Sequence, residues 1–294
     1  MPFHQPGIRI RITLTPMRRK LFALFLCVVL PACARLGTNL QQQALPPGAP
    51  SVETILSDLA ANDAAIRTFK ATGSFTLKSP ELAATQLLRE SSIQFRRPGN
   101  LYVVGRKYAT TVFRLTCIGP AFLIEFPTEK QYYFSPKGEH FEGISKTVSP
   151  SDIAQEMLLP EDWTELSARQ VRLLEFNEAK QTAVLEIRTG ALRKRPHRRL
   201  AVEGLPWVIR RSELYDKFGN LLAVTTKDDY HELDAIRFPA KVECAFPSQD
   251  ALMRFDMRKI FLNTDLDDAS FRIEEHAAEL RDKGYEKLEP RSEP

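Results

Sequence analysis

The chain is poor in cysteine and lacks the spacings that cysteine chemistry uses. Its 294 residues include four cysteines, and no two of them form a CxxC pair, which excludes the usual redox and zinc motifs. Cys27 and Cys33 lie near the N-terminus, so Cys117 and Cys244 remain for the body of the chain. Both belong to alternating strand patterns and should point inward. A disulfide between them remains an alternative in an oxidising compartment. We favour two buried free thiols because the geometry of a disulfide bond is strict.

Recognisable catalytic motifs are also lacking. The sequence has no nucleophile elbow, no HExxH motif and no Gly-rich phosphate loop. The histidines are dispersed, and none lies four residues from another or from a cysteine: His4, His140, His197, His231 and His276. We interpret the acidic pairs as solvated charge in turns or in the C-terminal tail: Asp228-Asp229, Asp267-Asp268 and Glu274-Glu275. We therefore expect no enzyme activity, no metal and no cofactor.

Acidic residues are absent from the first 32 positions, and this changes the meaning of the net charge. The whole chain has 41 Lys and Arg against 37 Asp and Glu, but residues 1–32 hold five of the basic residues. The remainder has 36 basic and 37 acidic residues, so it is nearly neutral. Nucleic-acid binding therefore has no electrostatic support.

A long hydrophobic run is missing as well, because the apolar stretch Leu21–Leu30 is too short to span a bilayer. It follows the basic residues Arg18, Arg19 and Lys20 and ends in Leu30-Pro31-Ala32-Cys33. This arrangement is typical of a bacterial lipoprotein signal peptide, with a lipid attached to Cys33 after cleavage. An ordinary secretory signal is the alternative, and Met1 or Met17 could be the start.

Four segments follow from these patterns. Residues 1–32 are a signal peptide, and residues 33–50 are the lipidated Cys33 with a flexible tether rich in Gln and Pro. Residues 51–273 form the folded domain, and residues 274–294 form a charged tail that we expect to be a frayed helix or disordered. The domain begins with an amphipathic helix that Ser51 caps, and its apolar positions have helical spacing: Val52, Ile55, Leu56, Leu59 and Ile66.

From Thr68 to Leu262 the chain alternates apolar and polar residues in about a dozen short strands joined by tight turns. One predicted hairpin places Leu174 and Phe176 opposite Ala183, Leu185 and Ile187. Strands of this kind favour an antiparallel meander that forms a barrel or a sandwich.

One short helix interrupts the strands at Ser151–Leu159, between Pro150 and Pro160. Its narrow apolar face consists of Ile153, Met157 and Leu158, and we expect it to cover an apolar cavity as a lid. Phe122, Phe126 and Tyr133 are the candidate cavity residues. A closed core would explain these aromatic residues equally well, because filled and hollow barrels show the same alternation.

One strong basic cluster runs from Arg193 to Arg199. It is read either as a solvated loop between two strands or as a contact with anionic lipid headgroups.

The order of these elements resembles the LolA/LolB-like fold of lipoprotein-sorting proteins over roughly residues 51–273. The resemblance is carried by the N-terminal helix and by these blocks: Phe69-Lys-Ala-Thr-Gly-Ser-Phe-Thr-Leu, Phe95-Arg-Arg-Pro-Gly-Asn-Leu-Tyr-Val, Gln131-Tyr-Tyr-Phe, the helix after Ser149-Pro150, Glu213-Leu-Tyr-Asp-Lys-Phe-Gly-Asn, Tyr230, Ile236-Arg-Phe-Pro and Phe255. It implies a mainly β protein with a few helices, in which a half-open antiparallel β-barrel with a helical lid holds acyl chains. It also implies no catalytic residues.

The resemblance and the signal peptide together give the expected function. We expect a monomeric, lipid-anchored cell-envelope protein that binds acyl chains or the lipid moiety of lipoproteins, for lipoprotein sorting or lipid transport. Ala34 after the modified cysteine is not the aspartate that retains lipoproteins in the inner membrane of enterobacteria, so the resemblance favours the outer membrane, facing the periplasm. The alternative is a non-enzymatic interaction or regulatory module of the same fold that supports envelope assembly or stress sensing.

Overall fold

The computed structural model describes residues 48–80, 84–138, 163, 166, 170–189 and 195–289, which all belong to one unit, Pro47–Pro294. Several sequence predictions lie outside the described residues and stay predictions. They are the signal peptide 1–32, the lipidated Cys33, most of the tether, and the helix with Ile153, Met157 and Leu158.

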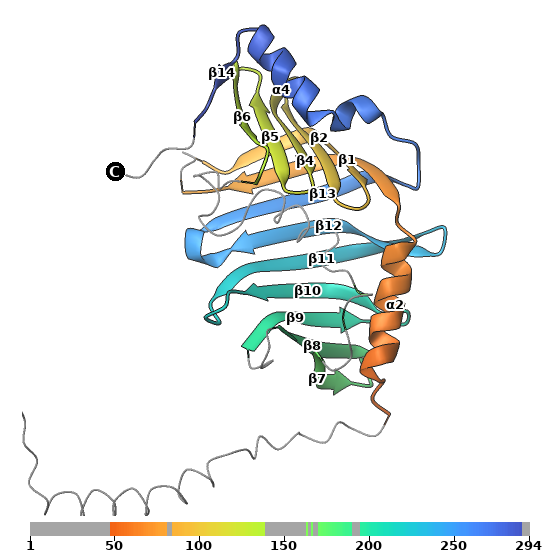
Figure 1. Ribbon diagram of the computed structural model, residues 1–294. Helices are drawn as coiled ribbons and strands as arrows, with labels where there is room; N and C mark the ends of the chain where they lie inside the picture. Colours follow the sequence, from red (N-terminus) through yellow and green to blue (C-terminus); the bar gives the residue numbers. More distant parts are fainter. Residues whose placement is uncertain are drawn as a thin grey trace, which may run out of the picture. The chain divides into compact units, whose positions relative to one another are not determined.

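The described strands form one large sheet of fourteen strands (Figure 1). Its spatial order is β14-β6-β5-β4-β3-β2-β1-β13-β12-β11-β10-β9-β8-β7. The strand bounds in chain order are β1 Thr68–Lys78, β2 Gln86–Arg96, β3 Asn100–Lys107, β4 Thr110–Ile118, β5 Ala121–Phe126, β6 Gln131–Ser135, β7 Val171–Asn177, β8 Thr182–Thr189, β9 Arg195–Glu203, β10 Val208–Tyr215, β11 Leu221–Leu233, β12 Ile236–Phe246, β13 Ala251–Leu262 and β14 Glu286–Lys287.

Short connections make most of this sheet an antiparallel meander, as the sequence predicted. For example, Phe95 of β2 lies opposite Leu101 of β3 across the turn at Pro98 and Gly99. Pairing of β1 with β13 joins the first six strands to the later ones, and β14 adds to β6 in the parallel direction. The described strands do not close into a ring, because β14 and β7 form the two ends of the sheet.

Alternation of apolar and polar residues gives the sheet two unlike faces. Phe75 lies opposite Phe255, and Phe255 lies opposite Val242, so these three side chains share one face. We call this the inner face; it continues through Leu200 and Leu185 in β9 and β8.

Helix α2 (Val52–Ala64) lies over one part of the inner face (Figure 1). Ser51 caps it as predicted, because its Oγ accepts a hydrogen bond of 3.1 Å from the backbone N–H of Thr54. Ile55, Leu56 and Leu59 are buried, which confirms the amphipathic pattern. No helix in the described part of the chain has the length and apolar character that a membrane crossing requires.

The apolar side chains of the inner face fall into two clusters. The helix-covered cluster joins α2 to β7–β10, and its buried members are Ile55, Leu56, Leu59, Trp163, Val171, Leu173, Ala183, Leu185, Ile187, Leu200, Val202, Trp207 and Ile209. The central cluster draws on β1–β6 and β11–β13, and its buried members are Ile66, Phe69, Ala71, Phe75, Leu88, Ile93, Phe95, Leu101, Val103, Cys117, Phe122, Ile124, Tyr133, Ala223, Ile236, Phe238, Val242, Cys244, Phe246, Ala251, Met253, Phe255 and Met257.

Both remaining cysteines lie in the central cluster as buried free thiols, which confirms the favoured alternative. Burial raises the pKa of the Cys117 thiol to about 12, so this group stays protonated and unreactive at neutral pH.

The predicted face of β7 is right at Phe176, which lies opposite Ala183 and packs against the helix-covered cluster, and wrong at Leu174. Leu173 rather than Leu174 is buried in β7, and Leu173 lies opposite Leu185. A register shift between Leu173 and Glu175 causes this difference, because a β-bulge changes which residues face inward. Simple alternation cannot anticipate such an insertion.

The predicted charged tail begins instead as a packed helix. Helix α4 (Ile273–Asp282) lies on the face of β4–β6 opposite to the central cluster, and a 3-10 turn (Asp268–Phe271) precedes it. We call its contacts the outer cluster: Leu123, Tyr132, Ile273, Ala277 and Leu280. The apolar residues of α4 recur at helical spacing and face the sheet, whereas the exposed surface of the helix is highly charged. The prediction of a frayed or disordered tail rested on that charge alone.

A buried carboxylate connects α4 to the sheet. Glu125 of β5 is 2% exposed and accepts hydrogen bonds of 2.8 Å from Arg114, while the His276 ring nitrogen lies 3.3 Å away. Burial raises the pKa of this carboxyl, but the hydrogen bonds from His276 and Arg114 outweigh burial and hold it below the ordinary value of 4.5.

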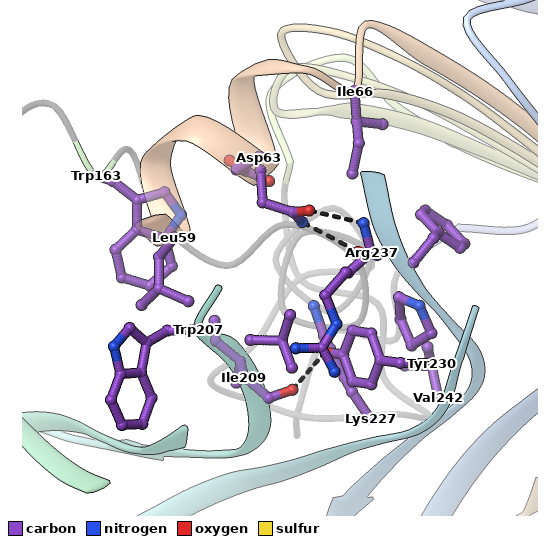
Figure 2. A pocket seen from close by; sticks show the side chains of 14 residues that line it. Leu59, Asp63, Ile66, Trp163, Trp207, Ile209, Lys227, Tyr230, Arg237 and Val242 are labelled. Carbon is purple, nitrogen blue, oxygen red and sulfur yellow. Dashed lines mark hydrogen bonds between the residues drawn. The ribbon is translucent and has the colours of Figure 1, made fainter. Parts of the chain in front are cut away.

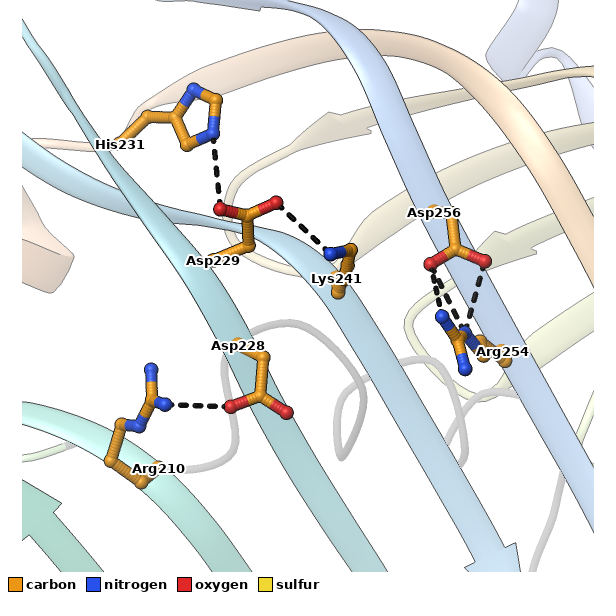
Figure 3. A network of polar contacts seen from close by, with 7 residues as sticks. All are labelled: Arg210, Asp228, Asp229, His231, Lys241, Arg254 and Asp256. Carbon is orange, nitrogen blue, oxygen red and sulfur yellow. Dashed lines mark hydrogen bonds and ion pairs between the residues drawn. The ribbon is translucent and has the colours of Figure 1, made fainter.

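Charged residues cover the opposite face of the central strands (Figure 3). Arg210 pairs with Asp228 at 2.7 Å, Lys241 pairs with Asp229 at 3.2 Å, and Arg254 pairs with Asp256 at 2.8 Å. The prediction that Asp228 and Asp229 lie in a turn is wrong, because both belong to β11. The positive φ of Asp229 marks a local irregularity, which lets two adjacent carboxylates meet different cations.

Candidate ligand site on the inner face

A small pocket opens where α2 meets β10–β12, at the boundary between the two inner-face clusters (Figure 2). Its volume is about 50 Å³. Apolar residues from both clusters form much of its wall, and polar residues complete it. The lining residues are Leu59, Asn62, Asp63, Ile66, Trp163, Trp207, Val208, Ile209, Lys227, Tyr230, Arg237, Phe238, Pro239 and Val242.

Hydrogen bonds between α2 and β12 fix one side of this pocket. The amide of Asn62 accepts a bond of 2.8 Å from the backbone N–H of Arg237 and donates one of 3.1 Å to its carbonyl. Asp63 forms an ion pair of 2.7 Å with Arg97. The end of α2 is therefore held to the sheet by polar contacts as well as by apolar packing.

Tyr230 and Arg237 form the floor of the pocket. The Tyr230 hydroxyl donates to the carbonyl of Ile209, and burial raises the pKa of this phenol above its ordinary value. The Arg237 guanidinium lies 5.7 Å from the centre of the Tyr230 ring and donates to the carbonyl of Pro206 at 2.8 Å. Tyr230 therefore remains a neutral hydrogen-bond donor at physiological pH.

Four polar side chains cross the inner face between the two apolar clusters. We call them the polar stripe, and each is at most 5% exposed: Arg198, Ser212, Thr225 and Lys227. Arg198 donates to Ser212 Oγ at 2.8 Å, and Ser212 lies opposite Thr225 in the β10–β11 ladder. Lys227 follows two residues later on the same face and lines the pocket.

The structure brings the predicted cavity residues together, but away from this pocket. Phe122 and Tyr133 are buried in the central cluster with their ring centres 5.5 Å apart, and Phe126 packs against the same cluster. They lie in β5 and β6, which β4, β3, β2, β1 and β13 separate from β12. Their role as ligand contacts stays a prediction.

The basic cluster predicted as a loop belongs in part to strand β9. Arg198 and Arg199 point to opposite faces: Arg198 enters the polar stripe, whereas Arg199 pairs with Glu186 at 3.2 Å on the other face. Arg193 and Lys194 lie outside the described residues. The solvated-loop reading is therefore wrong for Arg198, which lies in the interior.

Sequence reasoning missed Lys227 and Arg198 as interior residues. A signal was present for Arg198, because Leu200 and Val202 alternate with it and place position 198 on the apolar face. Lys227 gave no such signal, since charged residues occupy both faces of β11 around Asp228 and Asp229. Within the described ranges, no three His, Cys, Asp or Glu side chains gather as a candidate metal site.

Comparisons with known proteins show a similar fold but no matching sequence family. No family model matches the chain, and no curated protein matches it at a significant level. A solved domain from Vibrio parahaemolyticus, described as an outer membrane lipoprotein-sorting protein domain, is 15% identical with a TM-score of 0.50 over 77% of this chain and 97% of that one. A DUF1329 family protein from Desulfovibrio piger is 15% identical with a TM-score of 0.50 over 78% and 99%.

A LolA superfamily protein from Nitrosomonas europaea is 14% identical over 77% of this chain and 100% of that one, with a TM-score of 0.49. The two matches with a TM-score of 0.50 confirm the predicted LolA/LolB-like fold as a mainly β protein with a large open sheet and helices packed on it. The half-open barrel and its helical lid stay predictions.

Proposed function

We propose that this protein binds acyl chains, free or as the lipid moiety of lipoproteins, on the inner face of its sheet, and that it catalyses no reaction. The observation that carries the proposal is the apolar inner face, which extends from β7 to β6 and opens into a pocket at the boundary of its two clusters. The fold, shared with a domain described as lipoprotein-sorting, supports it.

Acyl binding requires the inner face to act as the wall of a half-open barrel. The pocket of about 50 Å³ is far below the roughly 300–1,000 Å³ of typical small-molecule sites. Side chains of the central cluster must therefore move to admit a chain. Met253 and Met257 are suited to this because unbranched methionine side chains adapt to neighbours of different shape.

The proposal includes a cell-envelope location. The lipoprotein signal predicted at Leu30-Pro31-Ala32-Cys33 would anchor a monomer to the outer membrane through Cys33, facing the periplasm. Changing Cys33→Ala should release the protein from washed membranes and remove the acyl mass from its N-terminal peptide. A variant that still sediments with membranes after a high-salt wash, beside a wild type without acyl mass, would contradict the anchor.

Ligand binding is tested with full-length protein purified from membranes in mild detergent. Native mass spectrometry should show a non-covalent lipid on the wild type, and a fluorescent fatty acid should displace it with saturable binding. Cys33→Ala serves as a control, because it removes the covalent lipid and should keep the non-covalent one. Absence of both a bound lipid and saturable probe binding would refute the proposal.

The small pocket favours the second candidate, an interaction module with a filled interior. In that case the protein would act through its surface, and aromatic residues at hairpin turns are the natural contacts. Tyr108 and Phe218 are both strongly exposed in such turns. Replacing them with serine would then abolish partner binding, whereas acyl binding should survive the same changes.

A further inference from the structure

We propose that an unbranched acyl chain binds across Gly105 on the inner face, in the space that opens when the Phe113 ring moves aside. This inference rests on the proposed acyl binding. It goes further by naming the place on the sheet where the chain lies and the shape of chain that this place accepts.

Gly105 occupies an inner-face position of β3 where the pattern of the strand calls for a large side chain. The two preceding inner-face residues of β3 are Leu101 and Val103, and both are buried in the central cluster. Gly105 is buried as well, and it lies directly opposite Phe113 of β4. Glycine in the interior of a strand weakens the strand, and it often marks a place where another backbone or a ligand comes close.

Gly73, the other glycine within the described strands, is explained by the sheet itself. A side-chain carbon at Gly73 would lie 1.9 Å from the backbone carbonyl oxygen of Asp256. At Gly105 such a carbon would instead meet side chains, the Phe113 ring at 2.4 Å and Leu88 at 2.7 Å. A register shift follows Gly105, but its φ is not positive, so the shift does not require glycine. Close approach of a second backbone therefore accounts for Gly73 and not for Gly105.

The side chain that covers Gly105 lies near an accessible margin of the inner face. Along β4 the inner-face residues change from buried Cys117 to partly exposed Leu115 and Phe113. Two neighbouring strands show the same change: Phe75 to Leu77 in β1, and Ile124 to Phe126 in β5. Because β1 to β5 are antiparallel, all three changes run toward the end of the strands that carries the β3–β4 turn. A ligand can therefore reach Phe113 from that end.

Moving the Phe113 ring disturbs few contacts. The ring is partly exposed, and it packs edge-to-face against Phe75 with the ring centres 5.7 Å apart. An aromatic pair of this kind contributes only modestly to stability. A methylene chain that takes the place of the ring against Gly105 restores the lost apolar contact, so binding can offset the displacement.

The position selects for an unbranched chain. Once the ring has moved, the floor at Gly105 is bare backbone, and Leu88 of β2 stands beside it. Leu88 reaches within 2.7 Å of the place that a side-chain carbon at Gly105 would take. A straight methylene chain can lie along the backbone between Leu88 and β4, whereas a methyl branch at this point would need the volume that Leu88 fills.

Two fatty acids test the shape of the ligand: hexadecanoic acid and a hexadecanoic acid with four methyl branches. Each competes with a fluorescent fatty acid for the full-length protein. The branched acid should bind at least about tenfold more weakly, although its four extra methyl groups would favour binding to an apolar surface of no particular shape. Equal or tighter binding of the branched acid would overturn the inference.

Two single variants test the place. Gly105→Ala adds a methyl group to the floor and should weaken binding of hexadecanoic acid about fourfold or more, the effect of one methylene group losing its burial. Phe113→Ala removes the side chain that must move, and it should raise the association rate measured by stopped flow, because a required conformational change slows binding. Phe261→Ala is the matched control, because Phe261 is 52% exposed, lies opposite Lys70 on the other face, and should leave both quantities unchanged.

The double variant Gly105→Ala/Phe113→Ala separates a direct effect of the methyl group from an effect transmitted through the ring. If the chain lies on Gly105, the added methyl group should weaken binding in the Phe113→Ala background as well. This background also leaves room for the methyl group if Gly105→Ala alone does not fold. Urea unfolding of each variant verifies that the titrated protein is folded.

Two further results overturn the inference while leaving acyl binding intact. In one, Gly105→Ala has no effect on affinity in the Phe113→Ala background, so the chain lies elsewhere. In the other, Phe113→Ala leaves the association rate unchanged, so the ring does not have to move. Failure of hexadecanoic acid to bind the wild type would instead refute the proposed function itself.

Discussion

The two apolar clusters of the inner face differ in the side chains that build them. Among the described residues, the buried part of the central cluster contains seven phenylalanines and two methionines. The helix-covered cluster consists of leucine, isoleucine, valine and alanine with two tryptophans, and its strands lie beneath α2. Branched aliphatic side chains have few rotamers and pack rigidly, whereas methionine adapts. The comparison indicates a rigid wall beside an adaptable one, with the polar stripe between them.

The largest expected effect tests the rigid wall. Leu185→Ala removes a fully buried side chain beneath α2, and it should lower the free energy of unfolding by about 2–5 kcal/mol. Affinity for an acyl probe, measured on the folded fraction, should not change. Urea unfolding gives the stability, and Val184→Ala on the other face of the same strand is the control, with an expected loss below about 1 kcal/mol. A small loss for Leu185→Ala would show that this cluster can also rearrange.

The adaptable wall should respond differently. Met253→Ala should cost about 2 kcal/mol, near the lower end for such changes, and should tighten acyl binding because it frees volume. Each additional methylene that the ligand buries adds about 0.8 kcal/mol, or about fourfold in affinity. Probe titration and urea unfolding measure the two effects, with Met253→Leu as the volume-conserving control. Equal stability losses at Met253 and Leu185 with unchanged affinity would erase the distinction between the clusters.

Glu125 extends the comparison to α4, the helix on the other face. Glu125→Gln weakens the contacts with Arg114 and His276, so it should cost about 1.5–2 kcal/mol at neutral pH. Because the pKa of Glu125 is lowered in the folded protein, its stabilisation is complete above the ordinary value of 4.5 and is lost as the pH falls through the folded pKa.

Urea unfolding at a series of pH values below about 5 should therefore show a steeper loss of stability in the wild type than in Glu125→Gln. Glu129→Gln, in the turn between β5 and β6, controls for the removal of a charge. Parallel pH profiles for wild type and Glu125→Gln would rule out a stabilising role for this carboxylate.

The smallest effect is expected on the charged face. Arg254→Gln removes ion pairs that are substantially exposed, so it should cost at most about 1 kcal/mol and should not alter acyl binding. The loss should shrink further in about 1 M salt, where charges are screened within about 3 Å. A large, salt-independent loss would mean that the two faces of the sheet contribute more equally than their composition indicates.

Most of the fold could be predicted from the sequence because its signals are local. The Ser51 cap, the turn at Pro98 and Gly99, and the alternation of Phe69, Ala71 and Phe75 each depend on neighbouring residues. The features that were missed depend on context. The bulge after Leu173 follows from pairing with β8, and the docking of α4 follows from an apolar surface on strands distant in sequence.

The site was less accessible to sequence reasoning. Lys227 lies in a run of charged residues, and only its neighbours in β12 show that position 227 faces the interior. The pocket combines α2 with strands more than 140 residues further along the chain, and no local pattern encodes that contact. The aromatic residues Phe122 and Tyr133 were recognised as inward-facing, but their distance from the pocket depends on the strand order.

The short parallel strand β14 has a consequence for solubility. An open sheet exposes unpaired backbone groups at its edge strands, and such edges can pair with other molecules and start aggregation. At one end of this sheet, the backbone N–H groups of Glu286 and Leu288 bond to the carbonyls of Lys130 and Tyr132, at 2.9 and 2.7 Å. The strand that covers β6 is only two residues long and consists of two charged residues, Glu286 and Lys287. The C-terminal segment thereby replaces a regular edge with a short charged one, which disfavours edge-to-edge association of sheets.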